Sequence, residues 1–207
     1  MMGYMLHNTQ AKTLGGVGAI FVLLSFVPYV GSILGLLGFV LTLVAIKYIA
    51  DNLNDRTIFN NMMIAVLLGV VGIMIGSLVV LGTVLNAFQS GYFTGPVLAP
   101  AASVTTAQWV AFGTEIGLGL LGAWVFLLAS AVYLRRSYKT IGAKLNVNRF
   151  GTAGWLYLVG AATTIVGIGF VLLLAAEIMT AVAFWSIPEQ PKKQLQSELV
   201  SSPAPSA

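Results

Sequence analysis

The sequence predicts an all-α fold, a polytopic transmembrane bundle of helices, and three features of the chain carry that prediction. The chain of 207 residues is 58% hydrophobic and only 8% charged, whereas soluble domains are roughly 25% charged. The charged residues avoid four long apolar stretches, at residues 13–46, 57–114, 116–134 and 150–176. Half of the basic residues are gathered instead in one short segment, at Arg135, Arg136, Lys139, Lys144 and Arg149. A soluble domain could not cover its surface with so few charges, whereas a lipid bilayer solvates an apolar exterior, so we expect a membrane protein.

The first apolar stretch, from Leu14 to Ile46, is too long for one untilted helix, because about 20 residues cross a bilayer. It is interrupted at Pro28, which removes a backbone donor and restricts the residue before it. Gly31 permits a turn just beyond. Two readings follow, a tight helical hairpin or one long kinked helix. The hairpin is favoured, because a helix ending at Val27 would already be about 27 Å long.

The remaining membrane segments are predicted between polar turns. With the first hairpin they make five segments, or four if that hairpin is one kinked helix. The predicted ranges are Gly31 to about Ala50, Ile58 to about Ala87, Trp109 to Leu134, and Thr152 to about Ile187. Residues 1–187 are expected to form one transmembrane domain, and residues 188–207 a disordered polar tail rich in proline.

The basic residues predict an orientation in the cell membrane. Eight Lys and Arg residues fall on the side of the basic loop 135–149, and two, Lys192 and Lys193, fall on the side of the tail. Cytoplasmic loops carry an excess of Lys and Arg. We therefore expect the basic loop in the cytoplasm and the C-terminal tail outside, and topology rather than nucleic-acid binding explains the net charge of +4. Aromatic residues near the predicted helix ends suit an interfacial belt, among them Tyr92, Phe93, Trp109, Tyr133, Tyr138, Trp155 and Trp185.

Glycines spaced by four occur in three of the predicted helices. The pairs are Gly31/Gly35, Gly72/Gly76 and Gly113/Gly117. Such pairs lie on one helix face and let two backbones approach closely. They predict tight packing within one chain or, alternatively, a homo-oligomer.

Glu115 and Glu177 are the two carboxylates within the apolar stretches. Along continuous helices, Glu115 lies about 29 Å from Leu134 and Glu177 about 37 Å from Thr152. With a hydrocarbon core of about 30 Å, both would sit near the outer boundary. They either face one another and bind a cation or proton, or are interfacial side chains that reach water.

Residues for enzyme chemistry are scarce. The chain has no cysteine and one histidine, His7, which excludes disulfides, thiolate metal sites and cysteine nucleophiles. It carries no metalloprotease, hydrolase, P-loop or dinucleotide-binding signature. We expect no enzyme, no catalytic, metal or cofactor-binding residue and no cofactor. The predicted function is a non-enzymatic membrane component or accessory subunit, with the bilayer and a second copy or another membrane protein as partners. The alternative is a small ion or solute carrier or channel that uses Glu115 and Glu177.

Five short stretches of the chain point to a known family. They are Lys12–Gly18, Phe26–Gly31, Ile58–Asn61, Phe150–Tyr157 and Ala183–Pro188. These stretches resemble an uncharacterised, mostly archaeal family of small multi-pass integral membrane proteins, a domain of unknown function. The resemblance covers nearly the whole chain up to Pro188. It implies a multi-pass helical fold in a cell membrane and assigns no activity.

Overall fold

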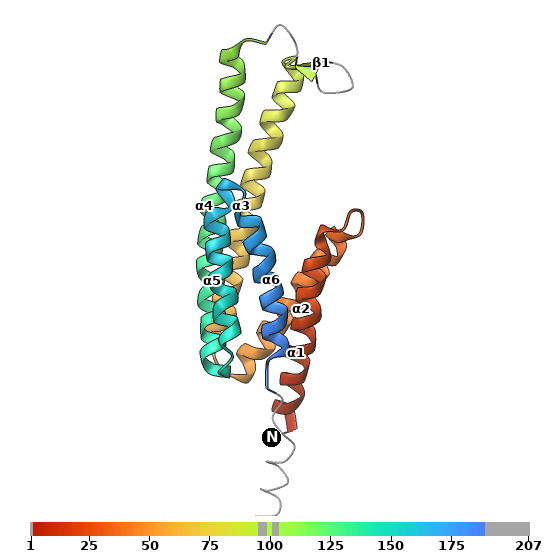
Figure 1. Ribbon diagram of the computed structural model, residues 1–207, viewed down its shortest axis with the longest axis vertical. Helices are drawn as coiled ribbons and strands as arrows, with labels where there is room; N and C mark the ends of the chain where they lie inside the picture. Colours follow the sequence, from red (N-terminus) through yellow and green to blue (C-terminus); the bar gives the residue numbers. More distant parts are fainter. Residues whose placement is uncertain (1, 95–98, 101–103, 189–207) are drawn as a thin grey trace, which may run out of the picture.

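The computed structural model describes residues 2–94, 99–100 and 104–188, and the predicted polar tail lies outside them apart from Pro188. These residues form six α-helices, two short 3-10 helices and one pair of two-residue strands (Figure 1). The helices are α1 (Met2–Leu23), η1 (Leu24–Phe26), α2 (Gly31–Asn52), α3 (Arg56–Gln89), α4 (Thr106–Leu145), α5 (Asn148–Thr163), η2 (Thr164–Val166) and α6 (Gly169–Trp185). The strands, β1 (Phe93–Thr94) and β2 (Ala99–Pro100), pair antiparallel between α3 and α4.

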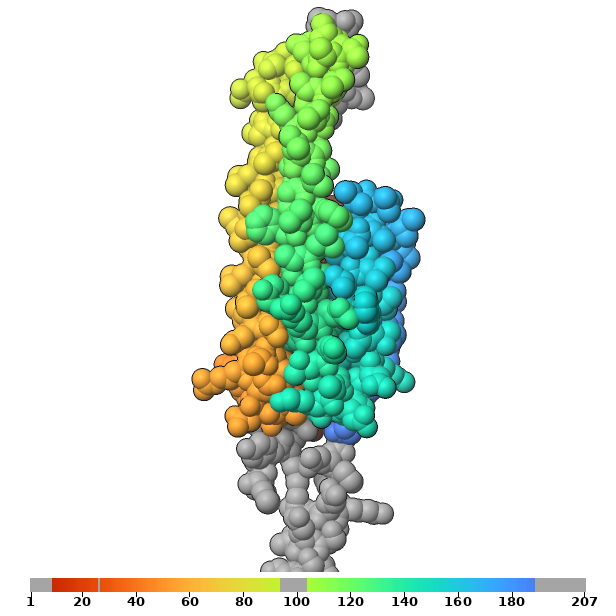
Figure 2. Space-filling model, turned by 90° about the vertical axis from the view of Figure 1, so that its left-hand side faces the viewer, coloured from red at the N-terminus to blue at the C-terminus, as the bar shows by residue number. Residues whose placement is uncertain are grey.

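The six helices are arranged as three hairpins that share one end of the molecule, α1–α2, α3–α4 and α5–α6 (Figure 1). The central α3–α4 hairpin is much the longest, since its helices of 34 and 40 residues extend about 51 and 60 Å. Its outer half therefore rises beyond the two shorter hairpins, and Figure 2 shows the resulting step above α5 and α6. Within the described residues, α2, α3 and α4 are long and apolar enough to cross a membrane.

The tight hairpin predicted at Pro28 is confirmed. Helix α1 gives way to η1, the chain reverses over residues 27–30, and α2 begins at Gly31. The Gly31 amide donates to the carbonyl of Val27 at 2.8 Å. Tyr29, at φ 69° and fully exposed, forms the tip. The alternative of one kinked helix is wrong.

Helix α4 extends further than the sequence predicted. It continues eleven residues past Leu134, to Leu145, so most of the predicted basic loop 135–149 is helical. The reason is amphipathicity: Ser137, Tyr138 and Ile141 are buried on one face, while basic side chains occupy the other. The hydropathy of this segment is dominated by its charged residues, so the sequence predicted a loop and not a helix with one buried face.

The predicted fifth helix, Thr152 to Ile187, is two helices, so the count of five membrane segments is not confirmed. The hydroxyl of Thr164 donates to the carbonyl of Gly160 at 2.7 Å, which competes with regular helix at the end of α5. Gly167 then adopts φ 83°, a conformation that glycine tolerates best. An added Cβ at Gly169 would clash with the carbonyl oxygen of Gly160, so glycine is required where the returning chain passes α5.

This reversal brings the end of α6 back to the basic end of the molecule. The Arg149 guanidinium at the start of α5 donates to the hydroxyl of Ser186, just after α6, at 2.7 Å. This contact places the basic segment and the residues that follow α6 at the same end of the molecule, whereas the sequence predicted opposite ends.

The core lies near this shared end, where all three hairpins meet. Tyr138, Phe150 and Phe184 are fully buried and stack edge to face, with ring centroids 5.7 Å and 5.1 Å apart. Ile46 and Ile58 complete the cluster from α2 and α3. The core thus ties the shorter hairpins to the long one and fixes the positions of side chains just above it.

Candidate functional site

A small group of polar side chains lies just above the aromatic core. Glu177 on α6 interacts with the phenol of Tyr157 on α5, which is placed to donate a hydrogen bond to the carboxylate. Thr180 lies one turn along α6, on the same face, because residues spaced by three are neighbours on a helix. Its hydroxyl donates to the carbonyl of Ala176 at 2.9 Å. The same hydroxyl lies beside the phenol oxygens of Tyr138 and Tyr157.

Glu177 lines a cleft between the α1–α2 hairpin and the rest of the molecule. Two adjoining cavities, of about 320 and 410 Å³, share the same carboxylate. The first is bounded by Thr42, Phe39 and Tyr138, and the second continues to Leu127 between the hairpins. Their common walls are Val22, Ser25, Phe39, Leu134, Tyr157 and Glu177.

No described Lys or Arg forms an ion pair with Glu177. Arg135 lies over the ring of Trp155, 3.7 Å from its centroid, and Lys144 pairs with Asp55 at 2.7 Å. Hydrogen bonds from Lys144 and from Thr57 at the start of α3 lower the pKa of Asp55 to about 2. Arg135 and Lys144 are therefore engaged with other side chains, and Glu177 has the Tyr157 hydroxyl as its hydrogen-bond partner.

The contacts between α4 and α5 fix how deep Glu177 lies. Gly154 sits against Arg135, where an added side chain would come within 3.2 Å of the Arg135 Cα. Further along, the indole of Trp124 donates to the carbonyl of Ala161 at 2.9 Å, about 16 Å beyond Arg135 along α4. Glu177, beside Tyr157, lies between these two levels. The continuous helix on which its predicted position at the outer boundary depended is not formed, because the chain reverses before α6.

Glu115 lies elsewhere. It is exposed on the outer half of α4, beside Thr83 and Asn86 of α3. Tyr138, which accompanies Glu177, is about 34 Å further along α4. The structure therefore does not bring the two glutamates together, and the shared cation site considered from the sequence is not formed.

The glycine pairs divide into two groups. Gly31, Gly35, Gly72 and Gly76 are packed within the chain, for example with Ser25 or with Ala123 and Phe126. Gly113 and Gly117 have no atom within 4 Å of an added side chain. Packing within one chain accounts for the first two pairs and leaves the third pair unexplained.

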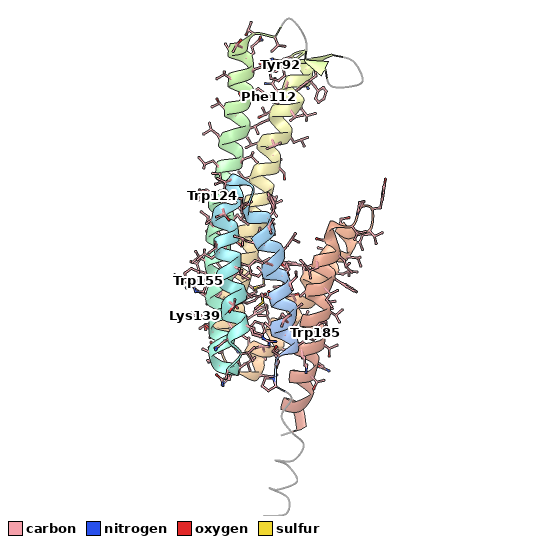
Figure 3. All side chains as sticks on the ribbon, in the orientation of Figure 1. Tyr92, Phe112, Trp124, Lys139, Trp155 and Trp185 are labelled. Atoms are coloured by element: carbon pink, nitrogen blue, oxygen red, sulfur yellow. The ribbon has the colours of Figure 1, made fainter. Side chains whose placement is uncertain are left out.

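Sequence reasoning missed most partners of Glu177. Tyr138 was placed in an interfacial belt, yet it is only 1% exposed. The sequence did not mark Tyr157, Ser25 or Thr42 as candidate site residues, because each is a single polar residue in an apolar run. Other aromatic residues gather at the outer end of α3–α4, around Tyr92 and Phe112 (Figure 3), with ring centroids 5.3–6.2 Å apart.

Comparison with known proteins identifies the family. The model of the family described as "Protein of unknown function (DUF996)" matches residues 34–178. The chain belongs to this family. It is also 28% identical over 191 residues to an uncharacterised protein of the archaeon Methanocaldococcus jannaschii, covering 89% of this chain and 96% of the relative. No solved structure gives a significant match. The resemblance seen in the sequence is confirmed, and neither the family description nor the relative's name states an activity.

Proposed function

We propose that this chain is a non-enzymatic integral membrane protein that acts as a subunit of a membrane complex, with its basic end in the cytoplasm. The observation that carries the proposal is the step between the long hairpin and the turn of α5–α6. In this proposal a helix from another chain packs on this step.

The step contains a groove of about 600 Å³ between α3–α4 and the α5–α6 turn. The turn presents apolar side chains to the outside, with Ile165 59% and Ile168 65% exposed. The groove is lined almost entirely by glycine and apolar residues, among them Gly69, Gly72, Gly117, Leu120, Trp124 and Phe170.

The depth of the α5–α6 turn in the bilayer is the reason to expect a protein partner. If the inner boundary of the hydrocarbon lies at Arg135, a core of about 30 Å ends near Glu115. The turn lines the groove together with Leu120 and Trp124 of α4, which lie inside that core. Irregular backbone at such depth is tolerated only where protein covers it or where it lines a water-filled cavity. The apolar lining favours protein.

The unexplained glycine pair supports the same surface. Gly117 lines the groove, and Gly113 lies one turn outward on α4. Small residues spaced by four permit close approach of a second transmembrane helix. The partner would therefore pack along the outer half of α4 and over the α5–α6 turn.

The distribution of charge supports the orientation. All eight Lys and Arg residues of the described chain belong to the half of the molecule where the hairpins meet, and the outer half of α3–α4 has none. An excess of Lys and Arg marks cytoplasmic segments. Both short hairpins would then enter the bilayer from the cytoplasm.

The reaction classes supported by the side chains are few. No group of three or more His, Asp or Glu residues in the described chain could hold a metal ion. Among the described residues, Glu177 has tyrosines and a threonine around it, and no second carboxylate or histidine that would complete an acid/base pair lines its cleft.

The native chain lacks cysteine, so single cysteines can test the groove directly. A benzophenone maleimide attached at Ile165→Cys or Gly117→Cys should photo-crosslink a protein partner in native membranes. Ile33→Cys on α2, 63% exposed, is the matched control. The intact mass of the adduct distinguishes a second copy from a different subunit.

Protein adducts at both groove positions and few at residue 33 would support the proposal. Lipid adducts alone at all three positions, together with a chain that purifies as a monomer in mild detergent, would refute it.

A further inference from the structure

We propose that the cleft beside Glu177 is a binding site for a hydrophobic organic ammonium ion. The proposal goes beyond the role as a subunit and does not depend on it. Glu177 and its aromatic neighbours border the cleft and not the groove at the step, and Ile73 and Leu127 border both.

The carboxylate supplies the charge complement. Glu177 faces the cleft about one helical turn past the level of Arg135, and no ion pair joins it to a described Lys or Arg. An ionised carboxylate at that depth is costly unless a cation accompanies it. A bound cation would provide the missing partner.

The walls indicate which cation fits. The rings of Phe39, Tyr138 and Tyr157 border the same cavity as the carboxylate. Aromatic faces attract ammonium groups, most strongly when water is excluded. The other wall residues, such as Met62 and Leu134, suit hydrocarbon substituents rather than the water shell of a metal ion.

The size of the cleft favours an organic ion. The cavity of about 320 Å³ beside Tyr138 is within the range that holds small organic ligands. A proton or a bare monovalent metal ion would leave most of it empty. The Tyr157 hydroxyl would hold one oxygen of the carboxylate in place and leave the other for the ligand.

The cleft also provides a route of entry. Its second cavity, of about 410 Å³, extends from Glu177 to Ile73 and Leu127, toward the middle of the long hairpin and away from the basic end. The apolar walls of this path suit a cation with a hydrocarbon body and not a strongly hydrated ion.

The test uses the purified full chain in detergent and benzyltrimethylammonium as the probe. Equilibrium dialysis should show saturable binding, and Glu177→Gln should weaken it about 30-fold or more, since removing one partner of a buried charge pair is costly. Tyr157→Phe should weaken it about fivefold through the lost hydrogen bond. Glu115→Gln is the matched control and should bind like the wild type.

A second measurement needs no variant. Dicyclohexylcarbodiimide modifies carboxyl groups in apolar surroundings, and mass spectrometry locates the adduct. Benzyltrimethylammonium should protect Glu177 from modification, whereas neopentylbenzene, its uncharged isostere of the same shape, should not. Equal binding by wild type and Glu177→Gln, or equal protection by the two probes, would overturn the proposal. Modification of Glu177 that no ammonium probe slows would reduce the site to proton binding and overturn it as well.

Discussion

The close crossing of α1 and α2 gives the sharpest test of the fold, through the substitution Gly38→Ala. An added Cβ at Gly38 would lie 2.5 Å from the carbonyl oxygen of Gly18 and 2.6 Å from the amide nitrogen of Val22. Ordinary contacts begin at 3.4 Å, so the two helices must separate by about 0.9 Å. Both obstructing atoms belong to the backbone, and no side-chain rotation can relieve the contact.

Overpacking of this kind costs about 1 to 3 kcal/mol, and backbone obstruction places Gly38→Ala near the upper value. Replacing glycine by alanine within a helix returns about 1 kcal/mol. We expect a net loss of about 2 kcal/mol, which lowers Tm by about 4 to 8 °C for a chain of this size. The assay is thermal unfolding in detergent, followed by circular dichroism.

Gly151→Ala on α5 is the matched control, because an added Cβ there meets nothing within 4 Å. It should melt at the wild-type temperature or slightly above. If Gly38→Ala is as stable as Gly151→Ala, then α1 and α2 do not cross as closely as described, and the position of the cleft wall formed by α2 is wrong.

Three further predictions concern the shared end and the path of the chain. Ser137→Ala removes a buried hydroxyl that donates to a carbonyl of α3 at 2.9 Å, so the melting temperature should fall by the equivalent of about 1 kcal/mol; an unchanged value would contradict this contact. The folded pKa of Asp55, about 2, lies below the ordinary 3.8, so the carboxylate stabilises the fold above about pH 4 and loses this effect as the pH falls toward 2. Asp55→Asn should therefore show a shallower loss of Tm between pH 4 and pH 2 than the wild type, and identical slopes would count against the ion pair. An impermeant maleimide should label a cysteine at Ser90 in intact cells, and cysteines at Ala143 and Pro188 only after permeabilisation. Labelling of position 188 together with position 90 in intact cells would indicate one continuous helix in place of α5 and α6.

The parts of the fold that the sequence predicts are those marked by charge or proline. Pro28 marks the first turn, and the charged residues around Asp55 mark the second, so α2 and α3 lie within a few residues of their expected ranges. The turn after Thr163 carries neither signal, because its residues are as apolar as the helices beside it. Only the excess length of the predicted helix, about 54 Å for a core of about 30 Å, pointed to a break.

The candidate site was harder to predict for the same reason. Glu177 stood out as a carboxylate in an apolar run, but its depth depended on the direction of the chain beyond residue 164. With the reversal, the carboxylate moves from the far boundary to the aromatic core, beside Tyr138 and Tyr157. These tyrosines come from two other helices, and only tertiary packing brings them to the glutamate.

The three hairpins also have a consequence for how the chain enters a membrane. The three segments that lie farthest from the basic end along their hairpins, residues 24–30, 90–105 and 164–168, contain no Lys, Arg, His, Asp or Glu. Carrying a charged side chain into the middle of a bilayer costs about 2.5 to 3.5 kcal/mol. If the chain inserts from the basic side, these turns therefore carry no Lys, Arg, Asp or Glu into the hydrocarbon. Each hairpin can enter as a pre-paired unit, and only the loop between α3 and α4 has to emerge on the far side.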